Sequence, residues 1–133
     1  MTFIKYYLIT VIIFLGIDFV WLGTVARDLY RNQIGFLMKE NFNMTAAFVF
    51  YLFFAAGITF FVVSRAVELD SWKYALYVGL FFGFITYSTY DMTNFATIKD
   101  WPLTITVIDI IWGSFLCGTT SILSYYVIKF FNF

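Results

Sequence analysis

Four apolar stretches, each about as long as a membrane-spanning helix, constrain this chain more than any other feature. A helix needs about 20 mostly apolar residues to cross the hydrocarbon core of a bilayer. The stretches that meet this requirement run approximately over residues 6–24, 45–64, 74–94 and 103–127. All eight Lys and Arg residues lie outside them, as the cost of burying a cation requires. We therefore expect residues 1–133 to form one all-α transmembrane domain, an integral membrane four-helix bundle.

The first connection is the longest and carries most of the charge outside the spans. Residues 25–44 alternate charged and apolar side chains, which is typical of a short helix lying in the membrane interface. Arg27 and Arg31 lie one turn apart there and are candidates for binding a lipid headgroup. The Lys and Arg residues divide four against four between the two sides. The positive-inside rule therefore assigns no orientation. An equal count is also compatible with insertion in both orientations and with an antiparallel homodimer.

Composition excludes several kinds of chemistry. The chain has no His and one Cys, which removes imidazole catalysis, His-ligated metals and thiolate clusters. Its formal net charge is zero. We expect no metal, no cofactor and no nucleic-acid partner; the expected partners are the lipid bilayer and a small-molecule or lipid ligand.

Three aspartates inside the predicted spans are the strongest functional signal. A carboxylate near the bilayer centre costs several kcal/mol, so such a residue normally faces the protein interior and is a functional candidate. At about 1.5 Å per residue, Asp18, Asp91 and Asp109 all lie within roughly 5 to 9 Å of the same end of the bundle. They are therefore expected to share one layer, whereas the second span, which has no ionisable acid or base, is expected to provide packing.

Each aspartate has polar-tipped aromatic or amide neighbours at helical spacing. The pattern Asp-x-x-Trp occurs twice, ending at Trp21 and Trp112. Residues three or four apart share a helix face, so each Trp should lie beside its Asp. The same spacing places further candidates around Asp91: Tyr87, Tyr90 and Asn94.

Small residues also recur at a spacing that favours close helix packing. Gly79 and Gly83 form such a pair in the third span, and Ser114 and Gly118 form another in the fourth. Pairs of this kind let helix backbones approach closely, within one chain or between two chains.

Three functions fit these acids. With no basic residue at their depth, the carboxylates are expected to share at least one proton. The hypothesis we favour is a small proton-coupled carrier of a cationic or polar organic solute, with Asp91 as the proton-exchanging residue. One alternative is a membrane-lipid-directed enzyme or an accessory subunit of lipid modification. The other is a structural or assembly protein in which the acids only fix helix register. We favour a role other than catalysis.

The chain also resembles a known family along essentially its whole length. The strings that carry the resemblance are residues 18–23 (DFVWLG), 89–94 (TYDMTN), 99–102 (KDWP) and 109–113 (DIIWG). They are similar to an uncharacterised family of small bacterial four-helix membrane proteins, catalogued as a domain of unknown function and a predicted membrane protein. The resemblance implies a multi-pass protein of the bacterial inner membrane and brings no established activity or cofactor.

Overall fold

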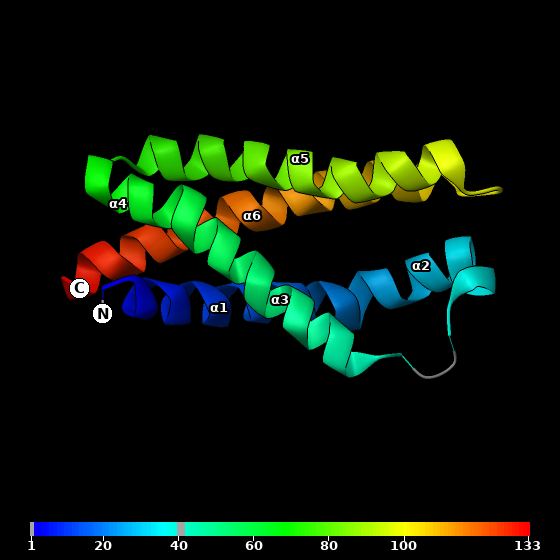
Figure 1. Ribbon diagram of the computed structural model, residues 1–133, viewed down its shortest axis with the longest axis horizontal. Coiled ribbons are helices and arrows are strands. Elements are labelled where there is room, and N and C mark those ends of the chain that lie inside the picture. The colour runs from blue at the N-terminus through cyan, green and yellow to red at the C-terminus, as the bar shows by residue number, and fades with distance from the viewer. Residues whose placement is uncertain (1, 40–41) are drawn as a thin grey trace.

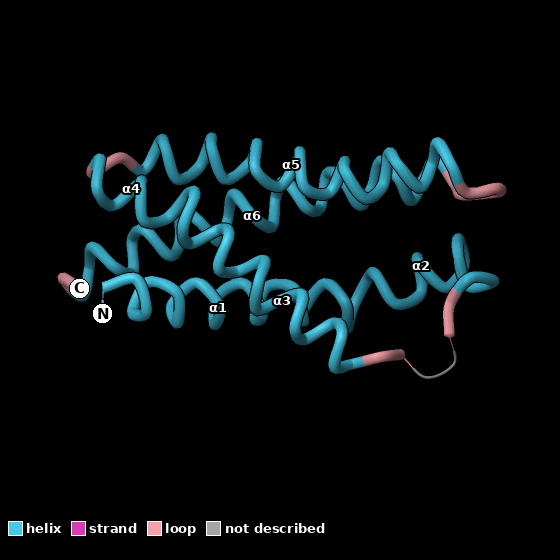
Figure 2. Tube along the Cα trace, in the orientation of Figure 1, coloured by secondary structure: helices cyan, strands magenta, loops and turns pink. Residues whose placement is uncertain are grey.

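The chain folds into helices that run alongside one another with both termini at one end (Figure 1). The computed structural model describes residues 2–39 and 42–133, and every element within these ranges is helical. Connections between the long helices are short and lie at the ends of the molecule (Figure 2). The all-α prediction is confirmed. Residues 40 and 41, which fall in the predicted interfacial segment, lie outside the described residues.

The first helix is longer than the first predicted span. Helix α1 (Thr2–Trp21) continues through a π-helical turn (Leu22–Ala26) into α2 (Arg27–Ile34), which is followed by a 3-10 turn (Gly35–Leu37). The helix predicted after the first span is therefore present, but it extends α1 instead of starting apart from it. Pro102 is the one proline of the chain, so no proline interrupts this run of helix.

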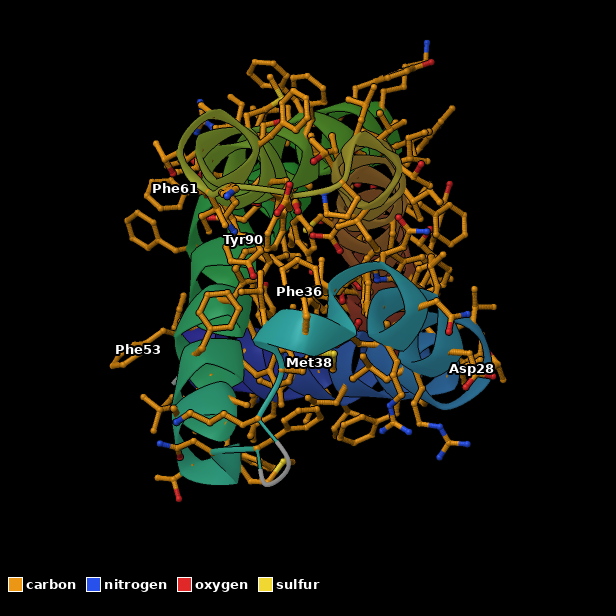
Figure 3. The ribbon with its side chains drawn as sticks, turned by 90° about the vertical axis from the view of Figure 1, so that its right-hand side faces the viewer. Asp28, Phe36, Met38, Phe53, Phe61 and Tyr90 are labelled. Carbon is orange, nitrogen blue, oxygen red and sulfur yellow. The ribbon has the colours of Figure 1, made fainter. Side chains whose placement is uncertain are left out.

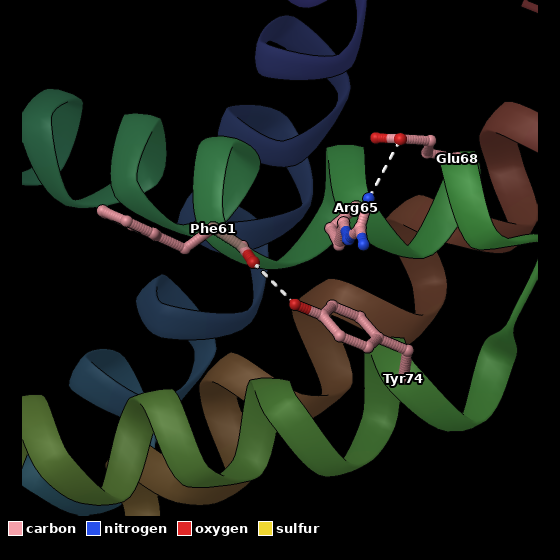
Figure 4. Close-up of polar contacts among 4 residues, drawn as sticks. All are labelled: Phe61, Arg65, Glu68 and Tyr74. Atoms are coloured by element: carbon pink, nitrogen blue, oxygen red, sulfur yellow. Dashed lines mark hydrogen bonds and ion pairs between the residues drawn. The ribbon is translucent and has the colours of Figure 1, made fainter.

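The second helical run is also continuous through a π-helical turn. Helix α3 (Met44–Ile58) leads through Thr59–Val63 into α4 (Ser64–Leu69). Figure 4 shows that the Tyr74 hydroxyl donates to the carbonyl oxygen of Phe61 at 3.4 Å, which ties this run to the next helix. Toward its N-terminus α3 diverges from that helix (Figure 1).

The last two helices pack together with very close backbones. Helix α5 (Trp72–Thr97) lies along α6 (Leu103–Phe131). A Cβ atom on Gly83 would stand 2.2 Å from the carbonyl oxygen of Gly113, and one on Gly79 would stand 2.9 Å from the carbonyl oxygen of Cys117. The close packing expected of the small residues thus takes place within the chain, between α5 and α6.

Much of the outer surface is apolar. Phe53 is 74% exposed and Ile12 is 70% exposed. Phe53 and Phe61 both point away from the helices in Figure 3. Many other large apolar side chains are exposed as well. Such a surface is unfavourable in water and suits the hydrocarbon of a bilayer.

Three helical runs among the described residues are long and apolar enough to cross a membrane. They are Thr2–Leu37, Met44–Leu69 and Leu103–Phe131. Helix α5 has 26 residues, which is also sufficient length at about 1.5 Å per residue. Its second half is less apolar because it carries polar residues such as Thr86, Thr89 and Asp91.

An exposed ion pair holds the turn between α4 and α5 against the end of α6. Asp70 ends α4 in a left-handed conformation (φ 52°), its carboxylate pairs with the Lys129 ammonium, and it accepts a hydrogen bond from the Tyr125 hydroxyl at 3.2 Å. The hydrogen bond from Lys129 holds the pKa of Asp70 below its usual range. Because that pKa is depressed, the stabilisation is present above the unfolded-state value and is lost as pH falls through the folded-state value.

We expect acid to destabilise the native protein more than its Asp70→Asn variant. Asparagine also tolerates the left-handed conformation, so this substitution removes the charge and leaves the turn intact. The measurement is detergent-solubilised thermal melting between about pH 6 and about pH 3. Equal loss of melting temperature in both proteins would show that the ion pair does not contribute.

Candidate functional site

A large cavity lies between the first two helical runs and the α5–α6 pair. Its volume is about 680 Å³, within the range of pockets that hold drug-sized organic ligands. Every long helix contributes to its wall, which is lined by Asp18, Trp21, Leu22, Tyr30, Ala47, Phe50, Tyr51, Phe54, Thr86, Tyr87, Thr89, Tyr90, Asp109 and Trp112. Aromatic rings and two carboxylates dominate this set, and none of these lining residues is basic. We call this space the aromatic cavity.

The two Asp-x-x-Trp patterns meet in the wall of the aromatic cavity. The rings of Trp21 and Trp112 stack with centroids 4.4 Å apart and planes 9° from parallel. The indole Nε1 of Trp112 donates to Asp18 Oδ1 at 3.3 Å. The second pattern thus supplies the donor for the acid of the first, and the repeat joins α1 to α6.

Asp109 has a different donor. The Tyr30 hydroxyl of α2 donates a hydrogen bond to Asp109 Oδ1. Tyr30 reaches α6 because α2 continues from α1 in nearly the same direction (Figure 1). The continuous helix therefore brings the Tyr30 side chain to Asp109. A separate helix lying in the membrane interface would not extend to this position.

Asp91 occupies a second, smaller pocket beside the aromatic cavity. This pocket has a volume of about 170 Å³ and is lined by Tyr30, Ile34, Met38, Tyr90, Asp91, Trp101, Ile105 and Asp109. Asp91 is fully buried, and neither carboxylate oxygen has a hydrogen-bond partner among the described residues. Tyr30, Tyr90 and Asp109 line both spaces. We call this smaller space the Asp91 pocket.

The structure brings most of the predicted site residues together. Those that line the aromatic cavity are Asp18, Trp21, Tyr87, Tyr90, Asp109 and Trp112. Asp91 instead lines the adjoining pocket, and Asn94 lines neither space. Arg27 and Arg31 are exposed on α2 and also line neither space, so they remain candidates for headgroup contact.

Two tyrosines of the site and the contribution of α3 were not predicted. Tyr30 was assigned to the interfacial segment, and the second span was expected only to pack. The structure places Phe50, Tyr51 and Phe54 of α3 in the cavity wall. The one sequence signal was Tyr51 itself, a polar-tipped ring in the interior of a span that has no ionisable acid or base.

We expect Tyr30→Phe to destabilise the protein by about 1.5 kcal/mol, because it leaves a partly buried carboxylate without its donor. Tyr77→Phe is the matched control, since Tyr77 is 61% exposed on α5. Denaturant titration of both variants in detergent measures the difference. Equal stabilities would mean that the Tyr30 bond to Asp109 contributes nothing.

The fold and the site define a small helical membrane protein that encloses an acidic, aromatic cavity near one end. The chain matches the family described as "Predicted membrane protein (DUF2177)" over residues 3–126. Since this match covers nearly the whole chain, the protein belongs to that family, and the predicted resemblance is confirmed. No curated protein and no solved structure matches the chain.

Proposed function

We propose that the protein is a small proton-coupled carrier that binds a cationic organic solute in the aromatic cavity. One observation carries this proposal: two carboxylates, Asp18 and Asp109, face a space of ligand size whose other walls are mainly aromatic and whose lining residues include no cation. A positive charge entering this space meets uncompensated negative charge in a poorly solvated environment, where the attraction is strong.

The aromatic walls suit the rest of such a ligand. The faces of Trp and Tyr rings attract cations and supply apolar contact area for an organic group.

The membrane arrangement belongs to the same proposal. Helix α5 is long enough to cross the bilayer and packs along α6, so we place it in the membrane as a fourth span. The location proposed is the inner membrane of a bacterium.

Titration with tetraphenylphosphonium, an apolar organic cation, tests the proposal. Tetraphenylborate has the same shape and the opposite charge, so it controls for partition into detergent or lipid. We expect saturable quenching of tryptophan fluorescence by the cation alone, because Trp21 and Trp112 line the cavity. Equal responses to the two ions would refute charge-selective binding.

A lipid-directed role is the second candidate, and one observation favours it. Phe50 and Tyr90 line the cavity and are 55% and 57% exposed. Wall residues this exposed are expected of a cavity that is open to the surrounding lipid near one end of the helices. Under this alternative, native mass spectrometry would detect a stoichiometric lipid that tetraphenylphosphonium fails to displace.

A further inference from the structure

We propose that the Asp91 pocket is a proton site separate from the cavity that takes the organic cation, and that Asp109 links the two. The inference rests on the proposed function, because the coupling has meaning only if a cation occupies the aromatic cavity. The aromatic cavity binds the cation, and the adjoining Asp91 pocket holds the proton.

The hydrogen-bond donors of the site indicate which acid carries the proton. Trp112 donates to Asp18 and Tyr30 donates to Asp109, whereas Asp91 has no donor among the described residues. An ionised carboxylate buried without donors is very unfavourable. A protonated Asp91 has an O–H group of its own, which needs an acceptor, and the Asp109 carboxylate lines the same pocket.

The other groups that face Asp91 offer no competing charge. Tyr30 from α2 and Tyr90 from α5 are the remaining titratable side chains of the pocket, and Asp109 is the acid from α6. The other lining residues, Ile34, Met38, Trp101 and Ile105, do not titrate. One proton held between Asp91 and Asp109 therefore removes the repulsion between a buried and a partly buried acid.

The pocket lies toward the end of the molecule that Figure 3 views, where Met38 is seen near the turn after α2. When a cation enters the aromatic cavity beside Asp109, it stabilises a second negative charge on the acid pair. The Asp91 O–H bond then breaks, and the proton passes to water at this end. The cation and the proton thus compete through Asp109 without sharing a space.

The competition predicts a proton count and a pH dependence. We expect release of about one proton per tetraphenylphosphonium bound. The affinity should rise about tenfold per pH unit over the pH range in which the free protein keeps the proton and the cation-bound protein has lost it. Isothermal titration of the full chain in nanodiscs, in buffers that differ in ionisation enthalpy, measures the release. Affinity measured across the pH range gives the slope.

The Asp91→Asn variant separates this inference from the proposed function. We expect it to bind the cation with an affinity that does not change with pH and without proton release, because Asp91 lies outside the aromatic cavity. Asp91→Glu, which restores a titratable acid, should recover the release, and melting curves establish that both variants fold. Proton release that persists in Asp91→Asn, or its absence in the native protein despite binding, overturns the inference. Absence of cation binding in the native protein overturns the proposed function instead.

Discussion

Replacing Asp18 by asparagine lowers the affinity for tetraphenylphosphonium by about ten- to a hundredfold, the value of a charge-assisted contact in a poorly solvated site. Asp18 is 4% exposed as a residue and lines the aromatic cavity. Asparagine keeps the size of the side chain and an oxygen that can accept from Trp112, so the substitution removes charge with little change in packing. Fluorescence titration at fixed pH gives the two dissociation constants.

The matched control for this result is Asp28→Asn. Asp28 is exposed on α2 and lines neither space, so its substitution removes the same formal charge from the molecule. A general electrostatic effect on cation accumulation would lower binding equally in both variants. Equal losses, or an unchanged affinity in a folded Asp18→Asn protein, would remove the carboxylate from the binding site.

Replacing Gly83 by alanine destabilises the protein by about 3 kcal/mol, at the upper end of the usual cost of overpacking. The added Cβ would meet the Gly113 carbonyl oxygen at 2.2 Å and the Cα of Ser114 at 2.8 Å. These are backbone atoms, so relief requires α5 and α6 to move apart. Tyr87, whose ring packs against Gly113, would be displaced with them, and cation binding should weaken as well.

Gly16→Ala provides the control for the glycine experiment. A Cβ at Gly16 in α1 has no neighbour within 4 Å, so alanine should be neutral or stabilising there because it favours the helix. Unfolding by sodium dodecyl sulfate in mixed micelles compares the two variants. A Gly83→Ala protein as stable as Gly16→Ala would contradict the close packing of α5 on α6.

The parts of the site that could be predicted are those fixed by spacing within a helix. Asp-x-x-Trp puts each Trp on the same helix face as its own Asp, and counting residues from the span ends puts the acids in one layer. Both rules depend on helical geometry alone. Four residues of the repeat accordingly line the same cavity. The hydrogen bond that the structure shows is instead made across the two patterns, from Trp112 to Asp18.

What could not be predicted depends on how each helix is rotated and where it ends. Tyr87 and Asp91 are four residues apart in α5, yet they line different spaces, because the boundary between the two spaces passes between them. Tyr30 joined the site because the helix continues through a π-helical turn where the charge pattern predicted a separate segment. Long-range contacts of this kind leave no periodic trace in the sequence.

Crystallography of the protein with tetraphenylarsonium tests the central claim most directly, because the arsenic atom scatters anomalously and marks the position of the cation. The account predicts an anomalous peak inside the aromatic cavity, beside the stacked Trp21 and Trp112 rings and facing Asp18 and Asp109. A peak confined to the lipid-facing surface, or a cavity filled by a lipid chain at a saturating concentration of the cation, would contradict it.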